Sequence, residues 1–281
     1  MAPDLNLITM GEMAEHRTSV LTTELLDDYE RNGFLVINPF AFSLQEIAEV
    51  RERLDLLSSD WSNIPRSRRV KGKVTTLPEG GSISEIPGVA VIDPVLRRSA
   101  LVRKCQAIAC ELLRVNRTWF HFDYAFYKQV GDKTGVTWHQ DAAYSRTRLT
   151  SRAVHFWVPL QDATLENGSL AYMPGSHRVG LQDYEKQGQG DGGVRATLGD
   201  DSRAVTCPVG VGGLVCHDPM TVHKSGPNLS SDIRRAWVLQ FGIGGWVSLR
   251  QAVQPIQSLY AQMQLAADRR RVSQSASTPP P

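Results

Sequence analysis

The sequence predicts a mainly β domain, a sandwich or barrel, with helices packed on its outside. From residue 119 onward, apolar side chains alternate with period two in many short segments bounded by Gly, Pro, Asn or Asp. The residues before this point carry helical periodicity instead. With 281 residues, 41% of them hydrophobic and 21% charged, the chain has the size and composition of one soluble domain with a substantial core.

The first elements are two helices with a short strand between them. Thr22 can cap a helix whose end is marked by Gly33, and the apolar run 34–37 that follows reads as a buried strand. Ser43 and Glu46 have the spacing of a capping box, in which each side chain bonds the other residue's backbone N–H. We therefore expect a second helix that starts at residue 43 and ends before residue 61.

Residues 62–88 change in character and predict a loop. They contain a basic run at 66–73 and several Pro and Gly residues. A solvated surface loop is the favoured interpretation, and a flap whose cations meet an anionic substrate group is the alternative. Beyond it, the apolar run 89–92 suggests a strand, and 96–115 has the strongest helical stripe of the chain.

The second half predicts strands in succession, with a single long loop. The loop is the polar, Gly-rich stretch 182–204, expected beside the mouth of the barrel. Residues 1–20 are expected to form a loose arm, 21–271 one domain that closes with a helix at 259–271, and 272–281 a disordered tail. The expected strands cover residues 119–127, the segment around 137–141, and residues 153–160, 169–173, 214–217, 221–224 and 236–242.

Composition argues against several classes of partner. The formal charge of +2, from 31 basic and 29 acidic residues, gives no reason to expect nucleic acid or a membrane surface. No apolar run reaches the roughly 18 residues of a spanning helix, and the N-terminus lacks the apolar segment of a secretory signal. The four cysteines lack the spacing of a zinc site or a disulfide framework. A reducing cytoplasm is therefore the expected location.

One short motif points to a metal. His139 and Asp141 stand two positions apart in a segment that reads as a strand, so their side chains should share a face. One more imidazole from a distant strand would complete a facial triad of two histidines and a carboxylate, which leaves three positions open and suits non-haem Fe(II) chemistry. Alone, His-x-Asp is a weak signal.

Three blocks in order strengthen it: residues 137–144, residues 166–177 with Glu-Asn-Gly-Ser-Leu and Pro-Gly-Ser-His, and residues 223–237 with His-Lys-Ser-Gly-Pro-Asn and a later arginine pair. Together they resemble the phytanoyl-CoA dioxygenase family. The resemblance implies a double-stranded β-helix, the cupin-like jelly-roll barrel. It also implies Fe(II), 2-oxoglutarate as co-substrate and O₂, with release of succinate and CO₂.

The resemblance makes His139, Asp141 and His223 the iron ligands and therefore catalytic. His217 is a rival to His223 because it too lies on a late strand, but it lacks the trailing Ser-Gly-x-Asn and arginine. Because related halogenases carry Gly or Ala at the carboxylate position, the presence of Asp141 favours oxygenation. The remaining histidines, His155 among them, are expected to be ordinary core, surface or turn residues.

The resemblance also implies a co-substrate site. Arg234, eleven positions after His223, would bind the distal carboxylate of 2-oxoglutarate, since a planar guanidinium meets a carboxylate through two parallel bonds. Ser225 would add a hydroxyl donor and Trp157 would wall the pocket. Arg235 is the competing arginine, but neighbours on a strand point in opposite directions.

Candidate substrate contacts are Tyr144, Phe126 and Arg148. For Phe126 a place in the barrel core is the favoured interpretation, and for Arg148 a solvated edge or loop. Together these expectations describe a dioxygenase that hydroxylates a small organic molecule, with an intermediate of secondary metabolism as the preferred class. Desaturation, epimerisation or rearrangement with the same cofactors, or a non-catalytic cupin-like metal-binding protein, remain alternatives. The oligomeric state and any use of a CoA ester stay open.

Overall fold

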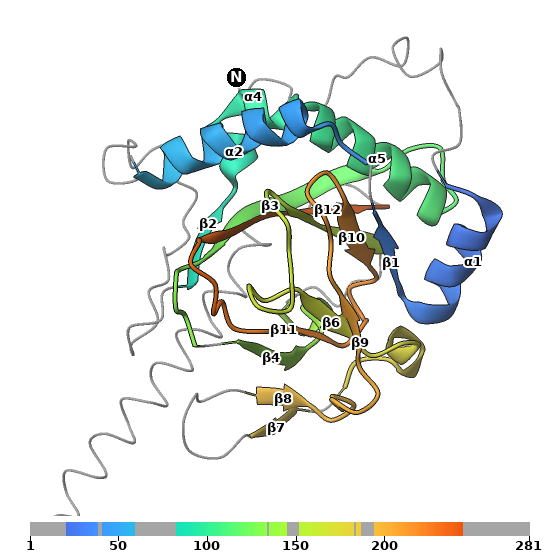
Figure 1. Ribbon diagram of the computed structural model, residues 1–281. Coiled ribbons are helices and arrows are strands. Elements are labelled where there is room, and N and C mark those ends of the chain that lie inside the picture. The colour runs from blue at the N-terminus through green and yellow to red at the C-terminus, as the bar shows by residue number, and fades with distance from the viewer. Residues whose placement is uncertain are drawn as a thin grey trace, which may run out of the picture.

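The computed structural model describes residues 21–38, 41–59, 83–133, 135–144, 152–182, 184–186 and 194–243. Two antiparallel sheets face each other, and the helices lie against the outer side of the larger one (Figure 1). The larger sheet has the order β1 (Phe34–Ile37), β10 (Leu214–His217), β5 (Ala153–Pro159), β12 (Arg234–Gly242), β3 (Trp119–Lys128) and β2 (Ile83–Pro87). The smaller has the order β4 (Val136–His139), β11 (His223–Ser225), β6 (Leu170–Tyr172) and β9 (Val205–Cys207).

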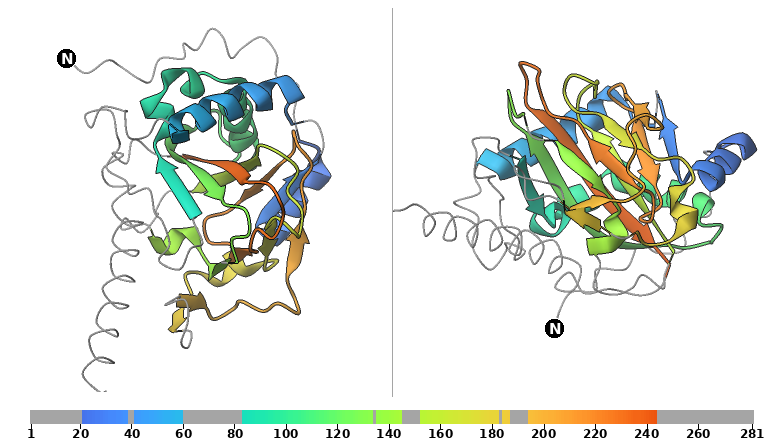
Figure 2. Two further views of the ribbon diagram at one scale, coloured as in Figure 1. Left: turned by 60° about the vertical axis from the view of Figure 1, so that its left-hand side comes forward. Right: turned by 90° about the horizontal axis from the view of Figure 1, so that it is seen from below.

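The helices are short and close to one another in sequence. They are α1 (Thr23–Asn32), α2 (Leu44–Ser59), α3 (Val89–Ile92), α4 (Pro94–Arg97) and α5 (Ala100–Leu112), with the 3-10 helices η1 (Asp141–Tyr144) and η2 (Ser176–Val179) in the second half. The left view in Figure 2 shows α2 and α5 on the same side of the larger sheet, as Figure 1 does. The main apolar core lies between these helices and the larger sheet.

Alternation along the strands separates that core from the interior between the sheets. On β12, Trp237 and Leu239 belong to the cluster that the helices cover. Ala236 and Val238 belong to a second cluster that faces the smaller sheet. Every second residue of β12 therefore points into the space between the sheets, and Arg234 is in phase with Ala236.

The sequence predicted the first elements well. Thr22 caps α1 by accepting from the N–H of Leu25, and Gly33 ends it with φ of 82°. In the capping box of α2, the N–H of Ser43 donates to Glu46 over 2.7 Å, and the N–H of Glu46 donates to the hydroxyl of Ser43 over 3.2 Å. The strand at 34–37 is confirmed.

Three expectations for residues 62–115 are wrong. The run 89–92 forms helix α3, because Gly88 turns the chain with φ of 68° and the carboxylate of Asp123 accepts the N–H of Ala90 at the helix start. A run of four apolar residues carries no period that separates strand from helix. The expected helix 96–115 is divided in two, since Ser99 caps α5. Strand β2 also occupies the end of the expected loop 62–88.

Further along, the expected strands are present, with ends shifted by at most two residues. The expected loop 182–204 contains a small hairpin of β7 (Tyr184–Lys186) and β8 (Val194–Ala196). The arm at 1–20, the basic run 66–73, the helix at 259–271 and the tail at 272–281 lie outside the described residues.

The fold class is confirmed at the level of architecture: antiparallel strands in two facing sheets with helices outside, as a double-stranded β-helix requires. The described strands form two facing sheets and the separate β7–β8 hairpin rather than one closed barrel. Among the helices of the described residues, none combines the length and hydropathy needed to cross a membrane.

Candidate metal and co-substrate site

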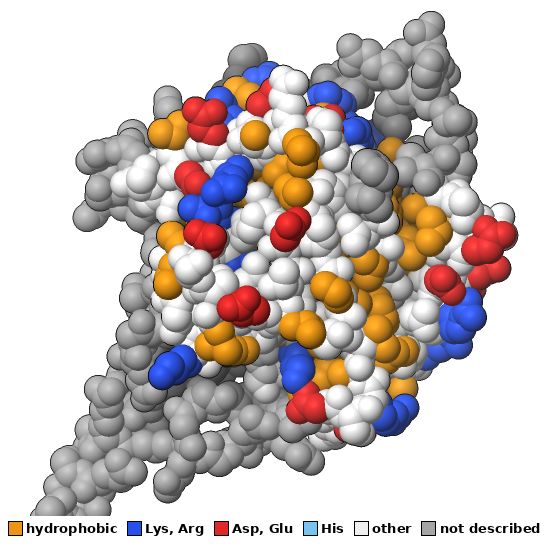
Figure 3. All heavy atoms as spheres, viewed as in Figure 1, with side chains coloured by type: hydrophobic (Ala, Val, Ile, Leu, Met, Phe, Trp, Pro, Cys, Tyr) orange, Lys and Arg blue, Asp and Glu red, His pale blue; other side chains and the backbone are white. Residues whose placement is uncertain are grey.

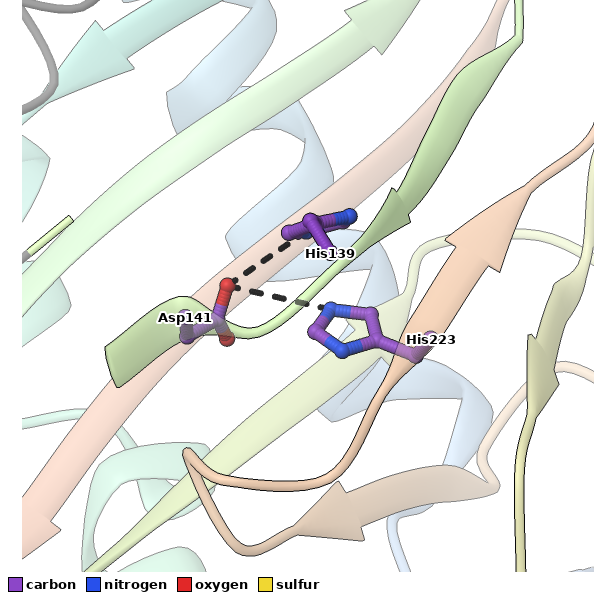
Figure 4. A group of neighbouring side chains, drawn as sticks. All are labelled: His139, Asp141 and His223. Carbon is purple, nitrogen blue, oxygen red and sulfur yellow. Dashed lines mark ion pairs between the residues drawn. The ribbon is translucent and has the colours of Figure 1, made fainter. Parts of the chain in front are cut away.

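His139, Asp141 and His223 converge between the sheets, and each offers one ligand atom within 4.8 Å of the other two (Figure 4). His139 ends β4 and His223 begins β11, and the two are direct partners across that strand pair. Their ring centroids lie 4.1 Å apart. The antiparallel register therefore brings together two histidines that are far apart in sequence.

Asp141 reaches this point by a different route from the predicted one. Strand β4 ends at His139, and Asp141 opens the 3-10 helix η1, so the two do not share a strand face. Backbone and side-chain bonds fix the turn: Ala142 donates to the carbonyl of Pro219 over 2.9 Å, and the buried amide of Gln140 donates to that of Met220 over 2.6 Å. The proximity is as expected, but a turn produces it.

Both histidines are held in one tautomer. Nδ1 of His139 lies 2.8 Å from the carbonyl of Thr137, and Nδ1 of His223 lies 2.9 Å from that of Thr221. Because a carbonyl only accepts, Nδ1 carries the hydrogen in each ring. Each Nε2 then presents its lone pair toward Oδ1 of Asp141, at 3.5 Å and 3.7 Å. Such second contacts orient metal-binding imidazoles.

The protonation states also suit a cation. Burial, with the nearby ring of His139, holds the pKa of His223 well below its usual value, so the imidazole is neutral. Burial alone would raise the pKa of Asp141, but the neighbouring histidines, His155 first, bring it well below the ordinary value. Two imidazoles and one carboxylate form a donor set suited to non-haem Fe(II).

Two further histidines meet the same carboxylate, and sequence reasoning missed their role. Nδ1 of His155 lies 2.5 Å and Nε2 of His217 lies 2.9 Å from Oδ2 of Asp141. His155 was expected to be an ordinary core residue and His217 a rival ligand. The two are partners across β5 and β10, a pairing that no local pattern reveals.

Arg234 lies on the inner wall and is fully buried. Among the described residues none of its three side-chain nitrogens has a hydrogen-bond partner. Its guanidinium lies between the rings of Phe126 and Trp157, 5.0 Å and 5.2 Å from their centroids. Arg235 points the other way and pairs with Asp55 over 2.7 Å. A buried guanidinium without hydrogen-bond partners marks a place where a carboxylate fits.

A second buried cation, which the sequence analysis missed, stands opposite. Lys128 on β3 is the register partner of Arg234, and its Nζ donates to the hydroxyl of Ser225 over 2.9 Å and to the carbonyl of Gly226. Burial and the charge of Arg234 hold its pKa well below the usual value. The period of β3 could have indicated it, since Lys128 is in phase with Phe126. Lys128, beside Arg234 on the larger sheet, thus reaches across to Ser225 on β11 of the smaller sheet.

The expected substrate contacts are less well placed. Phe126 stacks on Arg234 and so lies on the co-substrate side. Tyr144 ends η1 and its side chain is not described, and Arg148 lies outside the described residues. Glu85 on β2 is the partner of Phe126 and therefore faces inward. Burial raises its pKa to about 7, so a proton-bearing acid lines this wall near neutral pH.

The surface agrees with the balanced charge. On the described part of the face in Figure 3, basic and acidic side chains are interspersed. This face shows no single-sign patch of the kind that nucleic acid attracts.

Comparison with known proteins identifies a family and curated relatives that resemble this chain. The family profile described as Phytanoyl-CoA dioxygenase (PhyH) matches residues 29–236. Phytanoyl-CoA dioxygenase domain-containing protein 1 from Danio rerio is 32% identical over 168 residues, 57% of this chain and 57% of that protein. The chain thus matches a little over half the length of this curated relative.

Solved structures extend the likeness over more of the fold. The crystal structure of EvdO2 from Micromonospora carbonacea var. aurantiaca matches with a TM-score of 0.66 and 28% identity, covering 79% of this chain and 91% of that one. The same protein complexed with 2-oxoglutarate matches with a TM-score of 0.65 and 27% identity, over the same shares. These matches confirm the resemblance read from the sequence. The chain belongs to the phytanoyl-CoA dioxygenase family of non-haem iron, 2-oxoglutarate-dependent oxygenases.

Proposed function

We propose that this chain is an Fe(II)- and 2-oxoglutarate-dependent dioxygenase that hydroxylates a small organic molecule and releases succinate and CO₂. The observation that carries the proposal is the pairing of two features within one interior. Three ligand side chains converge there, and a buried arginine on the larger sheet makes no hydrogen bond among the described residues.

In this proposal His139, Asp141 and His223 hold the iron. Their donor set fits, since each imidazole holds Nδ1 against a backbone carbonyl and turns Nε2 toward Asp141, and the carboxylate adds one negative charge. Bound iron and 2-oxoglutarate together supply the oxidising power that O₂ needs to attack an unactivated C–H bond. The protein orients the reacting groups and excludes water from them.

Arg234 would bind the distal carboxylate of 2-oxoglutarate. Its planar fork suits a carboxylate, and the rings of Phe126 and Trp157 on either side hold the guanidinium in place. Ser225 would complete the clamp, with its hydroxyl already fixed by the ammonium of Lys128. A dicarboxylate that reaches from this wall to the three ligands would neutralise charges that are otherwise unpaired.

The substrate is proposed only as a class. A small organic molecule is consistent with the family, and an intermediate of secondary metabolism is preferred because bacterial and fungal relatives tailor such compounds. The same cofactors could yield desaturation, epimerisation or rearrangement. Product mass separates the first of these from hydroxylation: hydroxylation adds one oxygen and desaturation removes two hydrogens.

Anaerobic addition of Fe(II) and then 2-oxoglutarate tests the cofactor assignment. The proposal expects a weak visible charge-transfer band that requires both additions. Arg234→Met should lose the band at 2-oxoglutarate concentrations that saturate the parent, whereas Arg235→Met should retain it. A parent protein with verified iron that never forms the band would defeat the proposal. Succinate formation with a panel of metabolites would then separate an enzyme from a metal-binding protein without turnover.

We also propose a reducing compartment such as the cytoplasm. All four cysteines, Cys105, Cys110, Cys207 and Cys216, are buried free thiols. Burial raises the pKa of the Cys105 and Cys216 thiols, which keeps them protonated and unreactive.

A further inference from the structure

The two oxygens of Asp141 have different neighbours. Oδ1 faces Nε2 of His139 and Nε2 of His223, the atoms that point toward a shared metal position. Oδ2 is the oxygen that His155 and His217 contact, at 2.5 Å and 2.9 Å. Because His155 and His217 occupy Oδ2 in this way, only Oδ1 is available to bind a metal.

The contact from His217 has a defined direction. Nδ1 of His217 lies 3.0 Å from the hydroxyl of Tyr172, and Nε2 forms a hydrogen bond to Oδ2 of Asp141. Because a carboxylate oxygen accepts, the Nε2–H of His217 donates to Asp141, and the tyrosine hydroxyl donates to Nδ1 on the other side of the ring. The result is a chain of donors from Tyr172 through His217 to Asp141.

Packing fixes these groups in place. Tyr172 stacks on Phe34 with ring centroids 4.5 Å apart and on His223 with centroids 5.5 Å apart. Its side chain is fully buried, and those of His155 and His217 are nearly so. His155 approaches Oδ2 without good hydrogen-bond angles, since among the described residues neither ring nitrogen makes a bond of standard geometry. His217 is therefore the better-oriented partner.

We propose that His217, supported by Tyr172 and accompanied by His155, is a positioning residue that fixes Asp141 as a one-oxygen ligand through Oδ1. This inference rests on the proposed iron site. Occupying Oδ2 prevents the carboxylate from rotating or from binding the metal through both oxygens, so it takes a single coordination position. Three positions then remain for co-substrate and O₂, as a facial triad requires.

Asp141, His155 and His217 also offer one ligand atom each within 4.8 Å of one another. They could therefore hold a second metal ion, with the carboxylate of Asp141 as a bridge between two ions. One metal equivalent per chain is expected if the pair only positions Asp141. Two equivalents of saturable, tight binding would overturn the proposal in favour of a dinuclear centre.

The test uses Co(II), which binds such sites without turnover, in calorimetric titration of the apo chain. His217→Leu removes the donor, and we expect Co(II) affinity to fall by about 10- to 100-fold, the usual effect of losing a partner that orients a ligand. His217→Gln places an amide N–H close to the position of Nε2 and should recover most of the affinity. Tyr172→Phe, which removes only a hydroxyl, should weaken binding in the same direction by a smaller factor.

Cys216→Ala is the matched control, because it truncates a buried side chain on the same strand that faces the helices instead of Asp141. It should alter the unfolding temperature of the apo chain and leave Co(II) affinity unchanged. Parental affinity in His217→Leu, or equal losses in His217→Leu and His217→Gln, would overturn the positioning role. If the parent itself binds no Co(II), the proposed function fails as well, whereas parental binding with an unaffected His217→Leu defeats this inference alone.

Discussion

Replacing Arg234 with Met should make the apo chain more stable and at the same time abolish 2-oxoglutarate binding. Arg234 is fully buried, and its guanidinium makes no hydrogen bond among the described residues. Burial lowers its pKa from 12.5 to about 9. At roughly 1.4 kcal/mol per pH unit, this corresponds to a cost on the order of 5 kcal/mol for keeping the charge in the folded apo chain.

Part of that cost is offset by the rings of Phe126 and Trp157, each worth about 1–2 kcal/mol as a cation–π partner. Met has a similar length and no charge, and hydrophobic replacement of buried ion groups has stabilised proteins by roughly 1–4 kcal/mol. We therefore expect the free energy of unfolding of Arg234→Met to rise by about 1–3 kcal/mol without co-substrate. The parent should gain stability with 2-oxoglutarate concentration, and the variant should not.

Urea unfolding of the apo chain measures the first effect, the change in its stability. The same measurement after addition of Co(II) and increasing 2-oxoglutarate measures the second, the stabilisation by co-substrate. Arg235→Met is the control, because it removes the neighbouring arginine from the opposite face, where it pairs with Asp55. The free energy of unfolding of Arg235→Met should fall by up to about 1 kcal/mol, and 2-oxoglutarate should still stabilise this variant. An Arg234→Met protein less stable than Arg235→Met, or one still stabilised by 2-oxoglutarate, would refute the reasoning.

Three further outcomes are expected. Asp141→Ala should weaken Co(II) binding by more than about 100-fold in calorimetry, beyond the effect of groups that only orient a ligand; retained binding would contradict its place as a ligand. Burial raises the pKa of Asp123 to about 6, so the folded state holds that proton more tightly than the unfolded state. Stability should therefore fall by up to about 3 kcal/mol as pH rises from about 4 to about 6. Asp123→Asn should remove this slope in urea unfolding, and an unchanged slope would exclude Asp123 as its source. Asn228 is buried and donates to the carbonyls of Lys128 and Asp232 over 3.0 Å and 2.8 Å, so Asn228→Ala should cost about 2–4 kcal/mol by the same measurement. A cost below about 0.5 kcal/mol would show that Asn228 does not stabilise the loop between β11 and β12 in which it lies.

Local signals predicted what local physics decides. The cap at Thr22, the stop at Gly33 and the period of 119–127 each depend on a few neighbouring residues, and the structure has them. The run 89–92 was predicted wrongly because its helix depends on the carboxylate of Asp123, which accepts a backbone N–H at the start of that helix from a distant strand. A contact between residues far apart in the sequence is therefore the reason for this wrong prediction.

The candidate site shows the same division. The ordered motifs led to the three converging side chains, and alternation on a strand separated Arg234 from Arg235. Lys128 was missed as a neighbour of that site, and His155 and His217 were missed as partners of Asp141. Their roles follow from register between strands, such as the pairing of β10 with β5, and no pattern within one segment encodes a register.

The carbonyls of Thr137 and Thr221, which hold the rings of His139 and His223, have a practical consequence. Because the backbone sets both ring orientations, the receptor for the ion is already shaped before any ion arrives. Stripping and reloading with a redox-silent surrogate should therefore be reversible under native conditions. Such a surrogate complex would allow substrates to be soaked into crystals in air, with no risk of turnover.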